Sequence, residues 1–136
     1  MITIEAFLVE SLAIEGIERA PTRGECEATL RFVTATKIEI EHLAALVDVY
    51  APGHRLRDQV GLDVRVGNHI APRGGPNIAK ELRLLLIEAE ARRDPWATHC
   101  VYETLHPFTD GNGRSGRALW LHHMLRTDAF WAKVWR

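Results

Sequence analysis

Hydrophobic residues recur at helical spacing over most of the chain. Between residues 4 and 15 the apolar positions fall near one face of a helix, and Gly16 follows as a plausible stop. Two Thr-x-x-Glu patterns, Thr22–Glu25 and Thr36–Glu39, predict capping boxes that open two further helices. The second of these helices should end before Ala51-Pro52-Gly53, because proline and glycine interrupt helical geometry.

The second half of the chain continues the helical pattern. Apolar residues at three- and four-residue spacing predict a helix over about 78–93. Asp94-Pro95 is typical of an N-cap followed by proline at the first helical position. The helix that it opens should end at His106, because Pro107 disfavours helical geometry in the residue before it. A last helix is expected from about Arg114 onward.

One segment has a different period. Residues 62–70 alternate apolar and polar side chains, are rich in β-branched residues and contain the turn signal Gly67-Asn68. Prolines and glycines close the segment between Pro72 and Pro76. The sequence therefore predicts an all-α domain over residues 1–136 that carries one small β-hairpin flap at 62–72.

Composition and charge narrow the class of protein. The chain has 136 residues, 46% of them hydrophobic and 26% charged, which is typical of a single globular domain. A formal net charge of -1 gives no basic field for nucleic acid or a membrane surface. No apolar run reaches transmembrane length, and the N-terminal residues lack the pattern of a signal peptide. Cys26 and Cys100 form no pairing pattern, so we expect free thiols and a cytoplasmic protein.

The stretch from His106 to Arg117 gathers groups that suit a polyphosphate. Glycines on both sides of Asn112 allow the backbone to turn its N–H groups inward, and such a nest at a helix N-terminus binds anions. Arg114 and Arg117 lie three residues apart on one helix face and can reach toward the same anion.

Two more groups complete this candidate site. Asp110 would place a carboxylate beside the phosphates, where a magnesium ion is usually held. His106 has a side chain suited to accept a proton at neutral pH. Taken singly, the loop, the arginine pair and the histidine have ordinary structural explanations as a turn, a solvated face and a buried polar group. Their order and spacing favour a shared chemical role.

This stretch resembles the signature of the Fic family, HPFx(D/E)GNGRxxR, and matches it at every specified position. The resemblance implies a compact Fic-type helical domain that transfers AMP from ATP to a Ser, Thr or Tyr hydroxyl of a target protein. It also implies that His106 is the general base and that Asp110 binds Mg²⁺. Phe108 would pin the loop to the core.

The resemblance assigns the phosphates of ATP to the loop and the helix after it. Asn112 and the amides around Gly111 and Gly113 would hold the α-phosphate. Arg114 would contact the β-phosphate region, and Arg117 the γ-phosphate. In the reaction, the target hydroxyl would attack the α-phosphorus and pyrophosphate would leave with the metal.

A second resemblance lies far from the loop, near the N-terminus. Ser11-Leu12-Ala13-Ile14-Glu15-Gly16 is similar to the inhibitory motif (S/T)xxxE(G/N) of the same family. The resemblance implies that Ser11, Glu15 and Gly16 form a clamp, in which Glu15 pairs with Arg117 and keeps it from the γ-phosphate. Such a clamp could form within one chain or between subunits.

The flap also resembles a family feature, by its placement and alternation. In that family the target segment is thought to bind to the hairpin as an added strand, which places the target hydroxyl next to the histidine. The expected docking edge consists of Val64, Arg65, Val66, Gly67, Asn68, His69 and Ile70.

Other interpretations explain less of the sequence. Gly111 to Gly116 fits the dinucleotide fingerprint GxGxxG, but a helix rather than a strand precedes it. The pairs Glu39-x-x-His42 and Glu103-x-x-His106 suit a di-iron bundle, but this site would leave both arginines unused. Removal of AMP, another nucleotidyl or phosphoryl transfer, and a non-catalytic Fic module stay open as alternatives. The sequence does not indicate the target protein or decide between a monomer and a homo-oligomer.

Overall fold

Seven helices and one two-stranded hairpin make up the described part of the chain, residues 2–92 and 94–135 of a computed structural model. In chain order the elements are α1 (Ile4–Ile14), α2 (Arg23–Val33), α3 (Ile40–Tyr50), β1 (Arg65–Val66), β2 (His69–Ile70), α4 (Pro76–Arg92), α5 (Pro95–Leu105), α6 (Asn112–Thr127) and α7 (Ala129–Val134). The predicted class, a helical domain with one small antiparallel hairpin, is confirmed.

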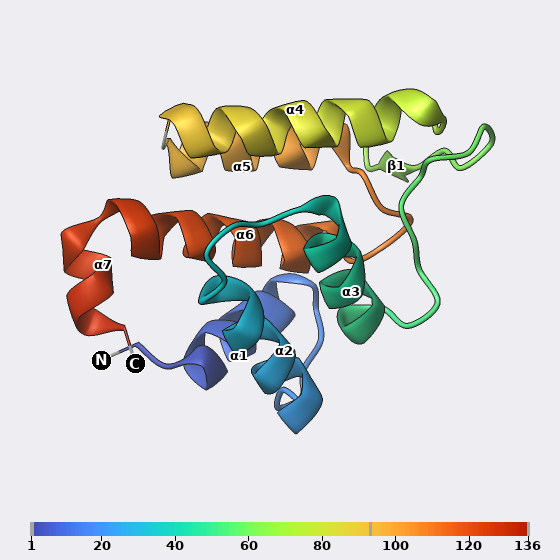
Figure 1. The fold of residues 1–136 in the computed structure, drawn as a ribbon. Helices are drawn as coiled ribbons and strands as arrows, with labels where there is room; N and C mark the ends of the chain where they lie inside the picture. The colour runs from blue at the N-terminus through green and yellow to red at the C-terminus, as the bar shows by residue number, and fades with distance from the viewer. Residues whose placement is uncertain (1, 93, 136) are drawn as a thin grey trace.

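Helix α6 is the centre of the fold. It packs against α5 on one side and against α1, α2 and α3 on the other, and α4 lies alongside α5 (Figure 1). Its buried side chains, among them Ser115, Leu119, Leu121 and His122, take their neighbours from both layers. Burial of this kind stabilises each large apolar side chain by about 1.5–3 kcal/mol. Helix α6 therefore lies between α5 on one side and α1, α2 and α3 on the other.

The predicted helix starts are confirmed with one exception. At Thr22 the capping box forms, since the Thr22 hydroxyl accepts from the Glu25 N–H at 3.1 Å and the Glu25 carboxylate accepts from the Thr22 N–H at 2.8 Å. The box at Thr36 was wrong, because α3 begins only at Ile40. Ile38 is buried in the core, and Glu39 after it has an extended backbone. The N–H of Glu39 donates to His42 Nδ1 at 2.9 Å.

The ends of the first and last predicted helices are set by short-range backbone contacts. Gly16 adopts a φ of 72° and ends α1 with the paired backbone bonds of a Schellman motif, Gly16 to Ala13 and Ile17 to Leu12. The expected last helix is in fact two, because Asp128 caps a separate helix α7 by accepting from the Phe130 N–H.

The hairpin is confirmed in place but is small. Arg65 pairs with Ile70 and Val66 with His69, and the turn falls at Gly67-Asn68 as predicted. Val66 and Ile70 are 50% and 71% exposed, so the alternation does not bury one face. The residues from Arg65 to Ile70 therefore present their side chains to solvent.

Candidate functional site

A short antiparallel pairing fixes the loop that follows α5. The N–H of Arg57 donates to the Pro107 carbonyl at 2.9 Å, and the N–H of Thr109 donates to the Arg55 carbonyl at 2.9 Å. Phe108 lies between these two bonds and is completely buried, as the sequence suggested. The loop is thus held to the core on both sides of its aromatic residue.

The side chain of Asn112 is bonded within the loop. Its side-chain amide exchanges two 2.8 Å hydrogen bonds with the backbone N–H and carbonyl of Phe108, and it is only 3% exposed. Both polar atoms of this amide therefore have partners within the loop. A phosphate would meet the backbone N–H of Asn112 rather than its side chain.

Replacing Asn112 with alanine is expected to destabilise the fold. It would leave the buried N–H and carbonyl of Phe108 without partners, and each costs about 1–3 kcal/mol. We therefore expect the free energy of unfolding to fall by about 2–4 kcal/mol in urea titrations. Asn68→Ala in the exposed turn of the flap is the matched control. Equal losses in the two variants would contradict this structural role.

His106 stands at the end of α5 with an unusual backbone. Its φ of 51° is the only positive value of a non-glycine residue in the described chain. The imidazole Nδ1 lies 3.2 Å from the Glu103 carbonyl, which can only accept, so the hydrogen of the neutral ring belongs on Nδ1. Nε2 then carries the lone pair, which is the form that a general base requires.

The surroundings of His106 keep its ring neutral. Burial lowers the pKa of the imidazole below its usual value, and the charge of Arg57 and the nearby His69 lower it further. The hydrogen bond to Glu103 and the charge of Glu15 oppose this shift without reversing it. A neutral ring at physiological pH is ready to accept a proton.

The loop leads directly into the N-terminus of α6. Gly111 is the N-cap with a φ of 77°, a conformation that favours glycine, and a side chain there would also contact Val47. The N–H groups of Asn112, Gly113 and Arg114 fall in the first turn, where an α-helix has no partners for them. Because the helix dipole is positive at this end, the first turn is suited to an anion.

The two arginines bind different elements. Arg114 is 8% exposed, and its Nη1 donates to the Tyr50 carbonyl at the end of α3 at 2.7 Å. Its Nε is buried without a partner. Arg117 turns instead toward α1. The expectation that both guanidinium groups face the same anion is not met in this arrangement.

Arg117 is held by the N-terminal helix. Its Nε donates to the Ser11 hydroxyl at 2.8 Å, and its Nη2 donates to the Ser11 carbonyl at 2.9 Å and to Glu15 Oε1 at 2.8 Å. The predicted ion pair of Glu15 with Arg117 is therefore present, within one chain. The Glu15 carboxylate also lies against Gly113, where it would overlap any added Cβ. It sits beside the same helix turn that is suited to an anion.

A comparison with protein-family models gives a match to the Fic/DOC family over residues 37–124, more than half of the chain. The chain belongs to the Fic/DOC family. Comparisons with curated proteins and with solved structures returned no match. In the described part of the chain, no helix combines the length and apolar character needed to cross a membrane.

Asp110 is the carboxylate of the Fic loop that fits a magnesium ion. Its side chain is 57% exposed, and Oδ1 accepts from the Gly111 N–H at 2.7 Å. His54 Nε2 and Arg114 Nη2 lie 3.9 Å from its two oxygens. A single accessible carboxylate beside a phosphate site suits Mg²⁺, which commonly takes one or two carboxylates together with substrate oxygens.

The described residues outside the Fic loop form no competing metal site. No group of three or more His, Cys, Asp or Glu side chains among them is placed to hold a metal ion. Glu39 and His42, one of the two pairs considered for a di-iron site, are engaged at the start of α3.

The flap lies beside the Fic histidine. His69 Nε2 is 2.9 Å from the Thr104 carbonyl near the end of α5, which brings β2 next to His106. Val64 is half-buried, while every residue from Arg65 to Ile70 is exposed. The placement agrees with the docking edge expected from the sequence, and the docking itself stays a prediction.

The sequence suggested Glu103 only as one half of a possible di-iron pair, and its place beside Arg117 was not expected. Glu103 lies one turn before His106, its Oε1 is buried without a hydrogen-bond partner, and it fits against Gly116 of α6 only because that residue lacks a Cβ. Burial raises the pKa of Glu103 to about 7, with Arg117 lowering it and Glu15 raising it. Its place between an α5 turn and Gly116 is visible only in the folded chain.

This raised pKa predicts that the contribution of Glu103 to the free energy of unfolding falls with rising pH. The folded protein binds the Glu103 proton more tightly than the unfolded chain, whose ordinary pKa is 4.5. The contribution is therefore complete below about pH 4.5 and is lost as the pH rises through about 7. Glu103→Gln removes this titrating group. The melting temperature of the variant minus that of the wild type should therefore increase between pH 5 and pH 8. A constant difference over that range would contradict the assignment.

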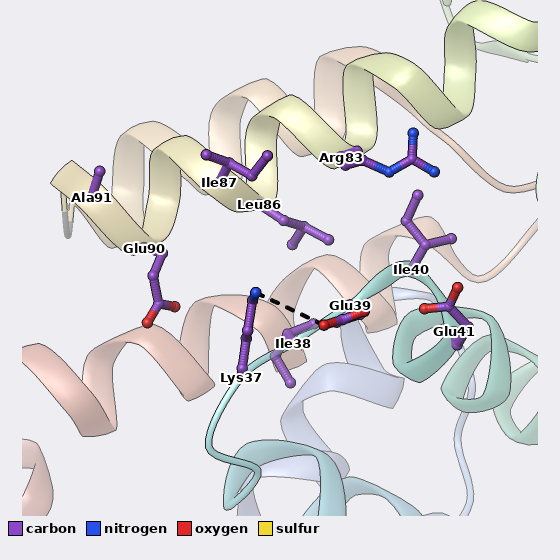
Figure 2. Close-up of a pocket in the computed structure, with 10 residues that line it drawn as sticks. All are labelled: Lys37, Ile38, Glu39, Ile40, Glu41, Arg83, Leu86, Ile87, Glu90 and Ala91. Carbon is purple, nitrogen blue, oxygen red and sulfur yellow. Dashed lines mark ion pairs between the residues drawn. The ribbon is translucent and has the colours of Figure 1, made fainter.

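A partly apolar groove lies away from this site. It has a volume of about 400 Å³ and opens between α4 and the segment that leads into α3 (Figure 2). Ile38, Ile40 and Leu86 contribute apolar side chains, with Lys37 and Glu39 paired at 3.8 Å on its edge. None of its lining residues belongs to the Fic loop, the clamp or the flap.

Proposed function

We propose that this Fic protein is a protein adenylyltransferase, which moves AMP from ATP to a Ser, Thr or Tyr hydroxyl of a target protein. The observation that carries the proposal is the joint placement of an imidazole with its lone pair on Nε2 and a helix N-terminus suited to phosphates. Both belong to a loop with the complete sequence HPFTDGNGRSGR. Membership of the Fic/DOC family supports transferase chemistry at this loop.

The reaction uses these groups in sequence. Nε2 of His106 takes the proton of the target hydroxyl, and the hydroxyl oxygen forms a bond to the α-phosphorus of ATP. The bond between the α-phosphorus and the oxygen that leads to the β-phosphate breaks, and pyrophosphate leaves with that electron pair. The first-turn N–H groups of α6 stabilise the negative charge that develops on the α-phosphate oxygens.

Asp110 is the residue that would hold Mg²⁺. When bound, the ion neutralises the phosphate oxygens and the leaving pyrophosphate. The carboxylate of Asp110 supports this role because it is 57% exposed and no cationic side chain lies closer to it than 3.9 Å.

We further propose that the protein holds itself inactive through α1. The ion pair of Glu15 with Arg117 supports this, because it occupies the guanidinium that would bind the γ-phosphate. Two additional bonds to Ser11 keep the guanidinium turned toward α1. The carboxylate also occupies space beside Gly113, so a triphosphate and the Glu15 side chain would compete for the same turn.

The test is mass spectrometry of the Glu15→Gly variant after incubation with ATP and Mg²⁺. The mass gain of one AMP on the protein itself or on an added cell-extract protein is the expected result. It should disappear when His106 is also changed to alanine. A gain of one phosphate in place of AMP would assign the site to phosphoryl transfer, and no modification of any protein would overturn the proposal.

A further inference from the structure

Arg57 is the largest side chain that is fully buried in the described chain. It lies between α3 and the flap and has no solvent exposure. Among the described residues no carboxylate lies within ion-pair distance of it. Because a buried charge is costly unless it is compensated, the structure must satisfy this guanidinium in another way.

Four backbone carbonyls provide that compensation. Nη2 donates to Leu105 at 2.9 Å and Nε donates to His106 at 2.7 Å. Nη1 donates to Leu62 at 3.0 Å and to Pro72 at 2.8 Å. The first pair are carbonyls at the end of α5, where a helix has no partners for them. The second pair stand at the two ends of the flap.

The backbone of Arg57 extends the same connection. Its N–H donates to the Pro107 carbonyl at 2.9 Å, and its carbonyl accepts from the Gly75 N–H at 2.9 Å. Arg57 is therefore bonded to His106 and Pro107 in the Fic loop. It is also bonded to both ends of the flap and to Gly75, which precedes α4. The positive φ of His106 is an unfavourable conformation that needs support of this kind.

We propose that Arg57 is a positioning residue, which locks the flap to the backbone of His106 so that a strand docked on the flap presents its hydroxyl to Nε2. This inference rests on the proposed function, because it concerns the same transfer step. The rigid planar fork of arginine is required, since four carbonyls in different directions need several fixed donors. His69, which contacts the Thr104 carbonyl, provides a second and weaker connection between flap and helix.

The first experiment compares Arg57→Lys and Arg57→Gln with Arg55→Lys, all in the Glu15→Gly background. Arg55 is an exposed neighbour whose guanidinium contacts Asp58 at 3.3 Å, so it controls for the loss of an arginine. We expect calorimetry with ATP and Mg²⁺ to give affinities within about threefold of the Glu15→Gly protein for all variants. We expect AMP transfer to fall about 100-fold in both Arg57 variants and to stay unchanged in Arg55→Lys.

The histidine signals separate positioning from a general loss of stability. Removing the nearby positive charge in Arg57→Gln should raise the pKa of His106 in an NMR titration, whereas Arg57→Lys retains the charge and should leave that pKa nearer its original value. If AMP transfer falls in both variants while the pKa of His106 changes mainly in Arg57→Gln, the loss is due to the position of the flap relative to His106. Unchanged transfer in folded Arg57→Lys would overturn the proposal.

A second measurement needs no change at Arg57. If the guanidinium locks the flap to the loop, the Nε–H of Arg57 and the amides of Arg57, Gly75 and Thr109 should exchange with deuterium as one unit, with protection factors within about threefold of one another. Protection of Gly75 more than about tenfold below that of Thr109 would overturn the coupling. This measurement does not depend on activity. A protein that transfers no AMP would contradict the proposed function, and hydrogen exchange would still decide whether Arg57 couples the flap to the loop.

Discussion

The Glu15→Gly protein is expected to transfer AMP about 10- to 30-fold faster than the wild type at subsaturating ATP. The reason is release of Arg117, which now binds Glu15 and Ser11. A charge-assisted bond contributes about 1.5–3 kcal/mol, and partial exposure reduces the value of an ion pair. Arg117 and Glu15 are 18% and 35% exposed, so the lower part of that range applies. The initial rate of AMP incorporation from labelled ATP and the ATP affinity by calorimetry measure the effect.

Two further variants test whether the charge causes this gain. Glu15→Gln keeps the shape of the side chain and removes the charge, so it should recover a large part of the increase. Glu18→Gly changes an exposed glutamate in the segment after α1 and should leave the rate unchanged. Equal rates in wild type and Glu15→Gly would refute the inhibitory role, and an equal gain in Glu18→Gly would assign the effect to loosening of the chain.

Changing His106 to alanine in the Glu15→Gly background is expected to lower transfer about 10²- to 10⁴-fold, the range typical of a general base. The affinity for ATP should change little, because the first turn of α6 and the arginines provide the phosphate contacts. Burial lowers the pKa of His106, so the neutral ring persists below the usual range of histidine. The rate should therefore hold at neutral pH and fall only as the pH drops through that lowered pKa.

His42→Ala is the matched control for this variant. His42 is an exposed histidine at the start of α3 and has no contact with the loop. It should retain the activity of Glu15→Gly. Full activity in His106→Ala would exclude the imidazole as base, and a parallel loss of ATP affinity would assign it to nucleotide binding instead.

The local features of this site could be predicted because their causes lie within a few residues. Pro107 ends α5, Gly16 ends α1 and Asp94 opens α5, each through a short-range backbone effect. The turn at Gly67-Asn68 was found for the same reason. The failure at Thr36 shows the limit, because burial of the nearby Ile38 overrode a valid capping pattern.

Contacts between residues far apart in the sequence could be predicted only where a family motif marked both residues. The ion pair of Glu15 with Arg117 spans most of the chain, and it was predicted only because both residues belong to motifs that resemble one family. No such family motif marked Arg57, and Glu103 was noted only in the Glu-x-x-His pair of the di-iron interpretation. Nothing in the sequence distinguishes Arg57 from Arg55, yet one is fully buried and the other exposed.

The sequence by itself determined the helical class, the hairpin and the helix ends on both sides of the loop from His106 to Arg117, since periodicity and local backbone preferences act over short distances. Only the tertiary structure decided how the polar groups are shared. It commits the Asn112 amide to Phe108, turns Arg114 to the end of α3 and buries Arg57 among four carbonyls. The physical reason is that a buried polar atom without a partner costs free energy, and the available partners depend on which distant segments the packed core brings together.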